Sequence, residues 1–224
     1  MRVVDLYPAY EGLRFDLLVV DGAADEHPNE IAHRIAAGVL RKVLDDVLLL
    51  ARGSLGTLIP QNGVELMLQG HRGARHPTHG LVVGFGSNRE WLAALAIALE
   101  RGDVAGLEWL REVRGMPIEV GLGPPHDAGE RDVTFTGRLD HRYAPEALAA
   151  MDVMVTPSIL PEAFGMVAAE GAAAGALPLV ARHSGLGEVG AELEAAIERP
   201  GLLTFESGPG AVARLAAGLD RVLE

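Results

Sequence analysis

The chain has 224 residues, of which 49% are hydrophobic and only 4% aromatic, so its core must consist mainly of Ala, Val and Leu. The net charge of −12 and the scattered positions of the 19 basic residues argue against nucleic-acid binding, which needs clustered cations. The absence of Cys excludes disulfides, thiol catalysis and Cys-based zinc sites. Residues 1–13 lack the apolar segment of a signal peptide and no apolar run approaches 18 residues, so we expect a cytoplasmic protein without a membrane span.

The first 45 residues predict a single βα unit. A strand is expected at 15–21 and a helix at 28–44, whose apolar face carries Ile31, Ile35, Val39 and Val43. One such unit is too small to bury a core of its own. We therefore expect residues 1–45 to be a separate N-terminal segment, a remnant or docking element, that packs on the rest of the chain or on a partner.

From residue 46 onward, predicted strands and helices alternate. The strands are expected at 47–51, 81–85, 132–136, 152–156, 177–181 and 202–205. The helices are expected at 63–72, 88–101, 104–114, 145–150, 165–174, 188–198 and 209–223. Apolar strands that alternate with helices are typical of a parallel sheet covered on both faces. Residues 46–224 are therefore predicted to form one doubly wound α/β domain.

The stretch 152–189 has the features of a ligand site. A strand is followed by a Pro-rich loop with Glu162, a helix opens at Gly165, and Glu170 lies one to two turns inside that helix. Ligands of open α/β sheets bind at the carboxyl ends of strands, and a helix N-terminus favours phosphate. Two carboxylates suit the paired hydroxyls of sugars and riboses. The alternative is a polar loop followed by a solvated helical glutamate.

The same stretch resembles a known family. Its PEAFGMVAAE resembles the Glu-x7-Glu motif of GT-B glycosyltransferases, especially glycosyltransferase family 4. The flanking DVMVTPS and AAAGALPLVARHSGLGEV resemble neighbouring blocks of that family, and LGTLIPQNGVELML, LVVGFGS and VTFTGRL resemble upstream ones. The resemblance covers roughly residues 46–224 and implies the nucleotide-sugar-binding C-terminal domain of a retaining hexosyltransferase, with a UDP-, GDP- or ADP-sugar as donor and neither cofactor nor metal.

The resemblance also implies roles for individual residues. Glu162 would be the catalytic-site residue that binds hydroxyls of the donor sugar, and Glu170 would bind the ribose diol. The remaining donor-binding positions would be the backbone amides of Gly165, Met166 and Val167, which hold the sugar and diphosphate, and Arg138 and Leu139, which lie beside the base.

The chain departs from the family pattern in two ways. Thr57 and Asn62 stand where the family usually has two cations that neutralise the diphosphate. The first 45 residues are also too few to form the N-terminal acceptor domain that completes a GT-B cleft. We therefore expect a second chain, a missing N-terminal domain or a homodimer. We also expect the helix at 209–223 to expose a hydrophobic surface unless it is paired. The alternative is a non-catalytic protein that binds a nucleotide sugar.

A second alternative comes from three glycines. Gly185, Gly187 and Gly190 form a G-x-G-x-x-G pattern after a predicted strand, and Glu206 follows where a dinucleotide fold keeps its ribose-binding acid. This pattern would indicate an NAD-binding domain. Three residues between the strand and the first glycine weigh against it.

Histidines and serines give weaker indications. His71, His76 and His79 lie close in sequence, but the turn residues around them favour a solvated loop over a metal site. Ser158 and Ser184 have no paired His at a motif spacing, so no serine hydrolase is predicted.

Overall fold

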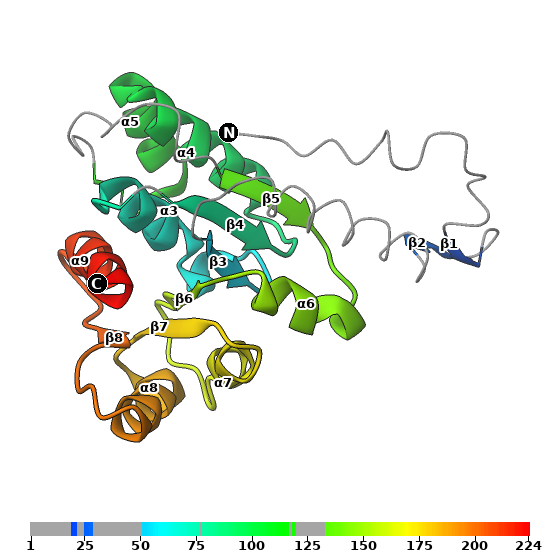
Figure 1. Cartoon of the computed structure of the whole chain (residues 1–224). Helices are drawn as coiled ribbons and strands as arrows, with labels where there is room; N and C mark the ends of the chain where they lie inside the picture. Colours follow the sequence, from blue (N-terminus) through cyan, green and yellow to red (C-terminus); the bar gives the residue numbers. More distant parts are fainter. Residues whose placement is uncertain (1–18, 22–24, 29–50, 77, 117, 120–132) are drawn as a thin grey trace.

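The computed structural model describes residues 19–21, 25–28, 51–76, 78–116, 118–119 and 133–224 (Figure 1). Its main element is a six-stranded parallel sheet in the order β5-β4-β3-β6-β7-β8. Counted along this domain, the order is 3-2-1-4-5-6, which is that of a Rossmann-like fold. The strands are β3 (Ala51–Leu55), β4 (His79–Val83), β5 (Val133–Gly137), β6 (Val153–Thr156), β7 (Leu177–Ala181) and β8 (Thr204–Phe205).

Helices cover both faces of the sheet (Figure 1). One face packs against α3 (Val64–Gly73), α4 (Arg89–Arg101), α5 (Val104–Arg114) and α9 (Ala211–Leu223), which share one large apolar cluster. The other face packs against α6 (Ala144–Ala149), α7 (Met166–Ala173) and α8 (Ser184–Ala196), whose residues lie in two smaller clusters. Two single-turn 3-10 helices, η2 (Pro60–Asn62) and η3 (His141–Tyr143), complete the described elements. The predicted doubly wound α/β fold is confirmed.

The core consists of small and aliphatic side chains, as the composition requires. All four residues of β6 are buried, and so are Leu179 and Val180 of β7. The close approach of the layers depends on glycines. A Cβ on Gly53 would collide with the side chain of Met151, and one on Gly70 would lie 2.8 Å from Leu215 Cγ. Within the described part of the chain, no helix is both long and apolar enough to cross a bilayer.

Most predicted elements lie within a few residues of the observed ones, with two informative differences. The first strand of the sheet is Ala51–Leu55, whereas the apolar run predicted it at 47–51, and residues 47–50 lie outside the described residues. Arg52 is buried in this strand, so its polar character hid the strand in the sequence pattern. Helix α8 begins at Ser184, whereas the sequence pattern predicted its start at 188.

The N-terminal segment differs from its prediction where it is described. Strand β1 (Val19–Asp21) covers only the end of the predicted strand and pairs antiparallel with β2 (Asp25–Pro28), which was not predicted. Pro28, the expected first residue of a helix, belongs to β2. The rest of that predicted helix, with Ile31, Ile35, Val39 and Val43, lies outside the described residues.

The helix at the C-terminus was expected to expose a hydrophobic surface unless it is paired, and it is paired within the chain. The apolar face of α9 packs on α3 of the same chain, and Val212, Leu215 and Leu219 are fully or almost fully buried. The close contact is allowed by Gly70 and Gly73 of α3, which face Leu215 and Ala216. The absence of a Cβ at these two positions thus lets the helices approach closely, a pairing that periodicity within a single segment does not reveal.

Candidate functional site

The loop between β6 and α7 carries the predicted site. It ends at Gly165, which has φ 59° and lies in the left-handed region that favours glycine. A Cβ there would also lie 3.0 Å from Leu186 Cδ2. Among the described residues, none accepts a hydrogen bond from the amides of Gly165, Met166 or Val167. The start of α7 therefore offers backbone donors at the positive end of the helix dipole.

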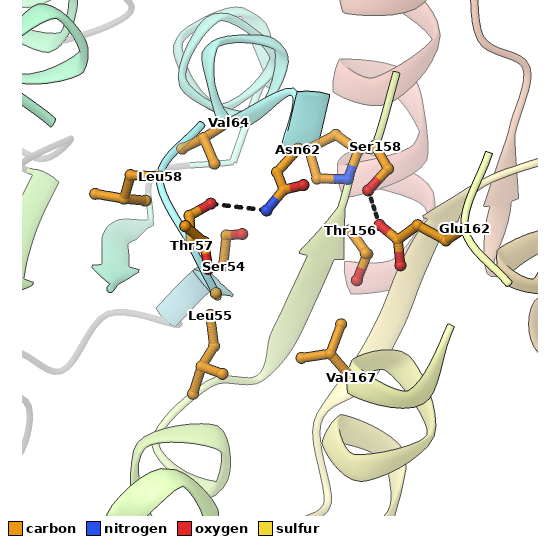
Figure 2. Close-up of a pocket in the computed structure, with 12 residues that line it drawn as sticks. Ser54, Leu55, Thr57, Leu58, Asn62, Val64, Thr156, Ser158, Glu162 and Val167 are labelled. Carbon is orange, nitrogen blue, oxygen red and sulfur yellow. Dashed lines mark hydrogen bonds between the residues drawn. The ribbon is translucent and has the colours of Figure 1, made fainter. Parts of the chain in front are cut away.

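Glu162 lies in the middle of this loop and is held from two sides. Its carboxylate accepts a hydrogen bond from the hydroxyl of Ser158, which is buried, as Figure 2 shows. Its backbone amide donates to Ser184 Oγ at 2.9 Å, and its carbonyl accepts from the Gly185 amide at 3.0 Å. The side chain is half-buried, so the carboxylate has a defined position and still reaches solvent.

His183 links the same two segments. Its Nε2 lies 2.7 Å from the carbonyl oxygen of Ser158, and its Nδ1 lies 3.1 Å from Ser184 Oγ. Ser184 has φ 49°, which is unusual for a residue with a side chain. The start of α8 is therefore bonded directly to the loop that carries Glu162.

A pocket opens between the carboxyl ends of β3 and β6 (Figure 2). These strands are neighbours at the point where the strand order reverses, and ligands of open α/β sheets bind at this topological switch point. Ser54 and Thr156 contribute hydroxyls to its wall, and the Thr156 hydroxyl is buried with no hydrogen-bond partner among the described residues. The described lining consists of Ser54, Leu55, Gly56, Thr57, Leu58, Asn62, Val64, Thr156, Pro157, Ser158, Glu162 and Val167.

The electrostatic character of this pocket is set by a single group. Glu162 is the one charged residue among the described lining residues. Thr57 and Asn62 both line the pocket, and neither carries charge. The Asn62 side-chain amide donates to the Thr57 carbonyl at 2.7 Å, so it stabilises its own loop.

The remaining predicted positions lie around the pocket and not in its described lining. Met166, the first residue of α7, is 65% exposed, and Glu170 is half-buried one turn further along. Arg138 follows β5, and its guanidinium lies 5.9 Å from the centre of the Phe85 ring. Leu139 packs against the apolar cluster beneath α6 and α7. The structure thus brings Thr57, Asn62, Glu162 and Val167 together in one lining, and the other predicted positions lie outside it.

The dinucleotide pattern does not form the turn that such a motif needs. Gly185, Gly187 and Gly190 lie inside α8, where they allow close packing. A Cβ on Gly185 would collide with the Ala163 carbonyl, and one on Gly190 would lie 2.6 Å from Thr204 Cγ2. Glu206 lies 3.5 Å from Arg182 in an ion pair. These glycines have a packing role that explains them without a dinucleotide.

The histidines at 71–79 do not form a solvated loop, and that prediction was wrong for two of them. His71 lies in α3 and His79 in β4, both are buried, and their rings contact Thr78 and Thr134 respectively. The helix extends to Gly73, so only a short turn separates it from the next strand. Among the described residues, no group of three or more His, Asp or Glu side chains could hold a metal ion.

Sequence reasoning missed several residues of this region. Thr156 lies at the end of a predicted strand and so could have been recognised by its position at the sheet edge. His183 and Ser184 follow β7, the strand next to β6, but the contacts of His183 with Ser158 and of Ser184 with Glu162 depend on strand order. The bonded residues lie far apart in the sequence, so no local sequence pattern predicts these contacts.

The fold and this pocket define an α/β domain with a candidate ligand site at the switch point of its sheet. Residues 128–224 match the family described as Glycosyl transferases group 1. This segment contains the Glu162 loop, α7 and α8. The C-terminal part of the chain is therefore similar to that family. A comparison with curated proteins gives no match.

Solved structures show the same fold at low sequence identity. The catalytic domain of cholesterol-α-glucosyltransferase from Helicobacter pylori has a TM-score of 0.53 and 16% identity, over 78% of this chain and 86% of that domain. HepE from Anabaena, in complex with UDP and glucose, has a TM-score of 0.54 and 19% identity, over 84% and 42% of the two chains. Sucrose-phosphate synthase from Thermosynechococcus elongatus has a TM-score of 0.52 and 23% identity, over 84% and 39%.

These matches place the domain among GT-B C-terminal domains in fold. The chain spans less than half the length of HepE and of sucrose-phosphate synthase.

Proposed function

We propose that the chain is the donor-binding half of a GT-B glycosyltransferase, which holds a nucleotide diphosphate sugar at the pocket between β3 and β6. The observation that carries this proposal is the place of that pocket at the topological switch point, with Glu162 and the start of α7 beside it. A carboxylate next to unpaired helix amides offers an acceptor for hydroxyls and donors for phosphate within one site.

The proposed contacts follow from the groups that each residue presents. The Glu162 carboxylate accepts hydrogen bonds from sugar hydroxyls, and the buried hydroxyl of Thr156 gains the partner that it lacks. The amides of Gly165, Met166 and Val167 donate to the sugar and diphosphate. Of the predicted positions outside the described lining, Glu170 binds the ribose diol, and Arg138 and Leu139 lie beside the base.

The proposed assembly has a second part. Residues 46–224 form the donor domain, residues 1–45 are a separate segment, and the acceptor site comes from another chain or from an N-terminal domain. Transfer of a hexose with retention then takes place in the cleft between the two parts. Transfer needs donor and acceptor in near-attack geometry, so one half of the cleft alone binds the donor without turnover.

A second candidate is a non-catalytic nucleotide-sugar-binding protein. The observation that favours it is the absence of charge at Thr57 and Asn62, together with the hydrogen bond that engages the Asn62 amide. A leaving diphosphate without nearby cations is poorly stabilised, because charge-assisted hydrogen bonds are about twice as strong as neutral ones. Binding without turnover, even with a complete acceptor domain present, distinguishes this candidate.

Isothermal titration with UDP-, GDP- and ADP-sugars and with NAD tests donor binding. We expect at least one nucleotide sugar to bind, and a ligand at 100 times its Kd to add about 2.7 kcal/mol to the free energy of unfolding. Glu162→Ala should weaken this binding at least tenfold, since a charged hydrogen bond contributes about 1.5–3 kcal/mol. Glu192→Ala, which removes an exposed carboxylate of α8, is the matched control and should bind as the wild type does. Stabilisation by NAD and by no nucleotide sugar would contradict the proposal.

Activity assays test the two-part assembly separately. The purified chain should show no sugar transfer to lipid, sugar or protein acceptors. Turnover by this chain alone, abolished in Glu162→Ala, would contradict the need for a second part while supporting the glycosyltransferase proposal.

A further inference from the structure

A closed ring of hydrogen bonds joins Ser158, Glu162, His183 and Ser184. The Ser158 hydroxyl donates to the Glu162 carboxylate, and the Glu162 amide donates to Ser184 Oγ. Ser184 Oγ contacts one ring nitrogen of His183, and the other ring nitrogen contacts the Ser158 carbonyl. The ring therefore returns to the residue at which it began, and it fixes both the backbone and the side chain of Ser158 and Glu162.

The chemistry of the acceptors sets the direction of these bonds. A backbone carbonyl only accepts, so His183 Nε2 carries the proton that is donated to Ser158. In the neutral imidazole, Nδ1 is then an acceptor, and the Ser184 hydroxyl donates to it. This leaves a lone pair of Ser184 Oγ to accept from the Glu162 amide. Every hydrogen bond of the ring thus has one donor and one acceptor.

The backbone at the start of α8 is adapted to this contact. Ser184 has φ 49°, a left-handed conformation that is strained for a residue with a Cβ. The next residue, Gly185, donates its amide to the Glu162 carbonyl at 3.0 Å, and a Cβ on it would collide with the Ala163 carbonyl. The strained turn and the close approach both bring the start of α8 against the Glu162 loop. Strain of this kind clusters at functional sites.

We infer that His183 and Ser184 are positioning residues that set the direction of the Glu162 carboxylate and thereby the affinity for the sugar part of the donor. The inference rests on the proposed function, because it assigns the ligand of Glu162 to a sugar. His183 holds the Ser158 backbone, whose side chain orients the carboxylate, and Ser184 holds the Glu162 backbone. Both act through Glu162.

The ratio of affinities for a nucleotide sugar and its nucleotide diphosphate tests this inference. UDP-glucose and UDP are titrated into wild type, His183→Ala, Glu162→Gln and the double variant, after thermal unfolding has shown that each is folded. We expect the UDP-glucose to UDP affinity ratio to fall about tenfold in His183→Ala and in Glu162→Gln, with UDP affinity unchanged within about twofold. The double variant should show no further fall, because both changes remove the same interaction.

Two further variants separate positioning from general stability. In His183→Gln the side-chain amide can still donate to the Ser158 carbonyl, so part of the affinity ratio should be restored. His79→Gln alters a buried histidine at the first residue of β4, bonded to Thr134 at 2.9 Å, and should lower the melting temperature without changing the ratio.

Three results would overturn the inference. An unchanged affinity ratio in His183→Ala, or effects of His183→Ala and Glu162→Gln that add in the double variant, would show that His183 does not act through Glu162. A wild-type chain that binds neither UDP-glucose nor any other nucleotide sugar would overturn the proposed function as well. The first two results leave the proposed function intact, so the two failures are distinguishable.

Discussion

Two loops meet at the switch point of the sheet, and they share one backbone device. The loop after β3, at 56–63, and the loop after β6, at 157–165, each end in a left-handed glycine that begins a helix without a side-chain cap. Gly63 has φ 65° and Gly165 has φ 59°. The loops also contact each other, because the Ile159 amide donates to the Gln61 carbonyl at 2.8 Å. The same conformation therefore occurs twice around one pocket.

The two loops differ in what they present to that pocket. The loop after β6 presents the charged Glu162 and is followed by a helix whose first residues are partly exposed. The loop after β3 presents neutral side chains, its Asn62 is bonded to its own backbone, and the helix that follows is almost completely buried. The same backbone conformation is therefore found with two different sets of side chains. The loop after β6 adds a charged group to the pocket, whereas the loop after β3 adds none and leads into a helix of the core.

The largest expected effect tests the structural role of the first loop. Gly63→Ala should lower the free energy of unfolding by about 4 kcal/mol, the sum of a left-handed Ala and a collision with the Pro157 carbonyl. Gly165→Ala should cost about 2 kcal/mol, because its new Cβ meets Leu186 at 3.0–3.1 Å. Urea unfolding measures both.

Gly102→Ala is the control for these two variants. Gly102 has φ 62°, and a Cβ added to it would meet no atom within 4 Å, so only the conformational cost of about 1–2 kcal/mol remains. If Gly63→Ala costs no more than Gly102→Ala, the two loops are not packed as tightly as the comparison requires.

A pH effect should arise from the buried helix of the first loop. Glu65 of α3 is fully buried, and burial raises the pKa of this carboxyl from 4.5 to about 7, against a lowering by a backbone hydrogen bond. The pKa of Glu65 is higher in the folded protein than in the unfolded chain. The contribution of this carboxyl to stability is therefore complete below pH 4.5 and is lost as pH rises through 7. The loss amounts to about 3 kcal/mol.

Glu65→Gln isolates this contribution. Urea unfolding of wild type and variant from about pH 4 to about pH 8.5 should show that the wild type loses stability relative to the variant as pH rises. All other groups titrate in both proteins, so the difference reports Glu65. A wild type that gains stability relative to the variant over this range would contradict the assigned burial of an uncompensated carboxylate.

The smallest expected effect comes from adding the positive charge that the loop after β3 lacks. Thr57→Arg and Asn62→Lys should each tighten UDP binding by about tenfold, or about 1.4 kcal/mol, because a charge-assisted bond contributes about 1.5–3 kcal/mol before screening. The gain should shrink with added salt, and uridine, which has no phosphate, should gain almost nothing. Isothermal titration of both ligands measures this.

The control for net charge is Ala105→Arg with Ala213→Lys, two exposed positions on α5 and α9. It adds the same two charges away from the pocket and should leave UDP affinity nearly unchanged. A folded double variant at Thr57 and Asn62 that binds UDP no better would show that these positions do not face phosphate.

The sequence predicted most of the α/β domain because its strands are short apolar runs between turn residues. The segment from β6 to β7 was predicted nearly residue by residue, since Pro, Gly and buried Val and Leu mark each boundary. The prediction failed where local signals disagreed with the packing. Ser184 and Gly185 suggest a turn, but the tertiary contact with the Glu162 loop stabilises them as the first turn of α8.

Glu162, Gly165 and the neutral Thr57 and Asn62 could be recognised from the sequence, because residue identity and helix or strand period are properties of a single segment. The sheet order decided which of them meet. The neighbouring positions of β3 and β6 bring Thr57 and Asn62 to the same pocket as Glu162, and the neighbouring positions of β6 and β7 bring His183 to Ser158. These contacts join residues that are distant in sequence, and only the packing of strands and helices on a common core determines them.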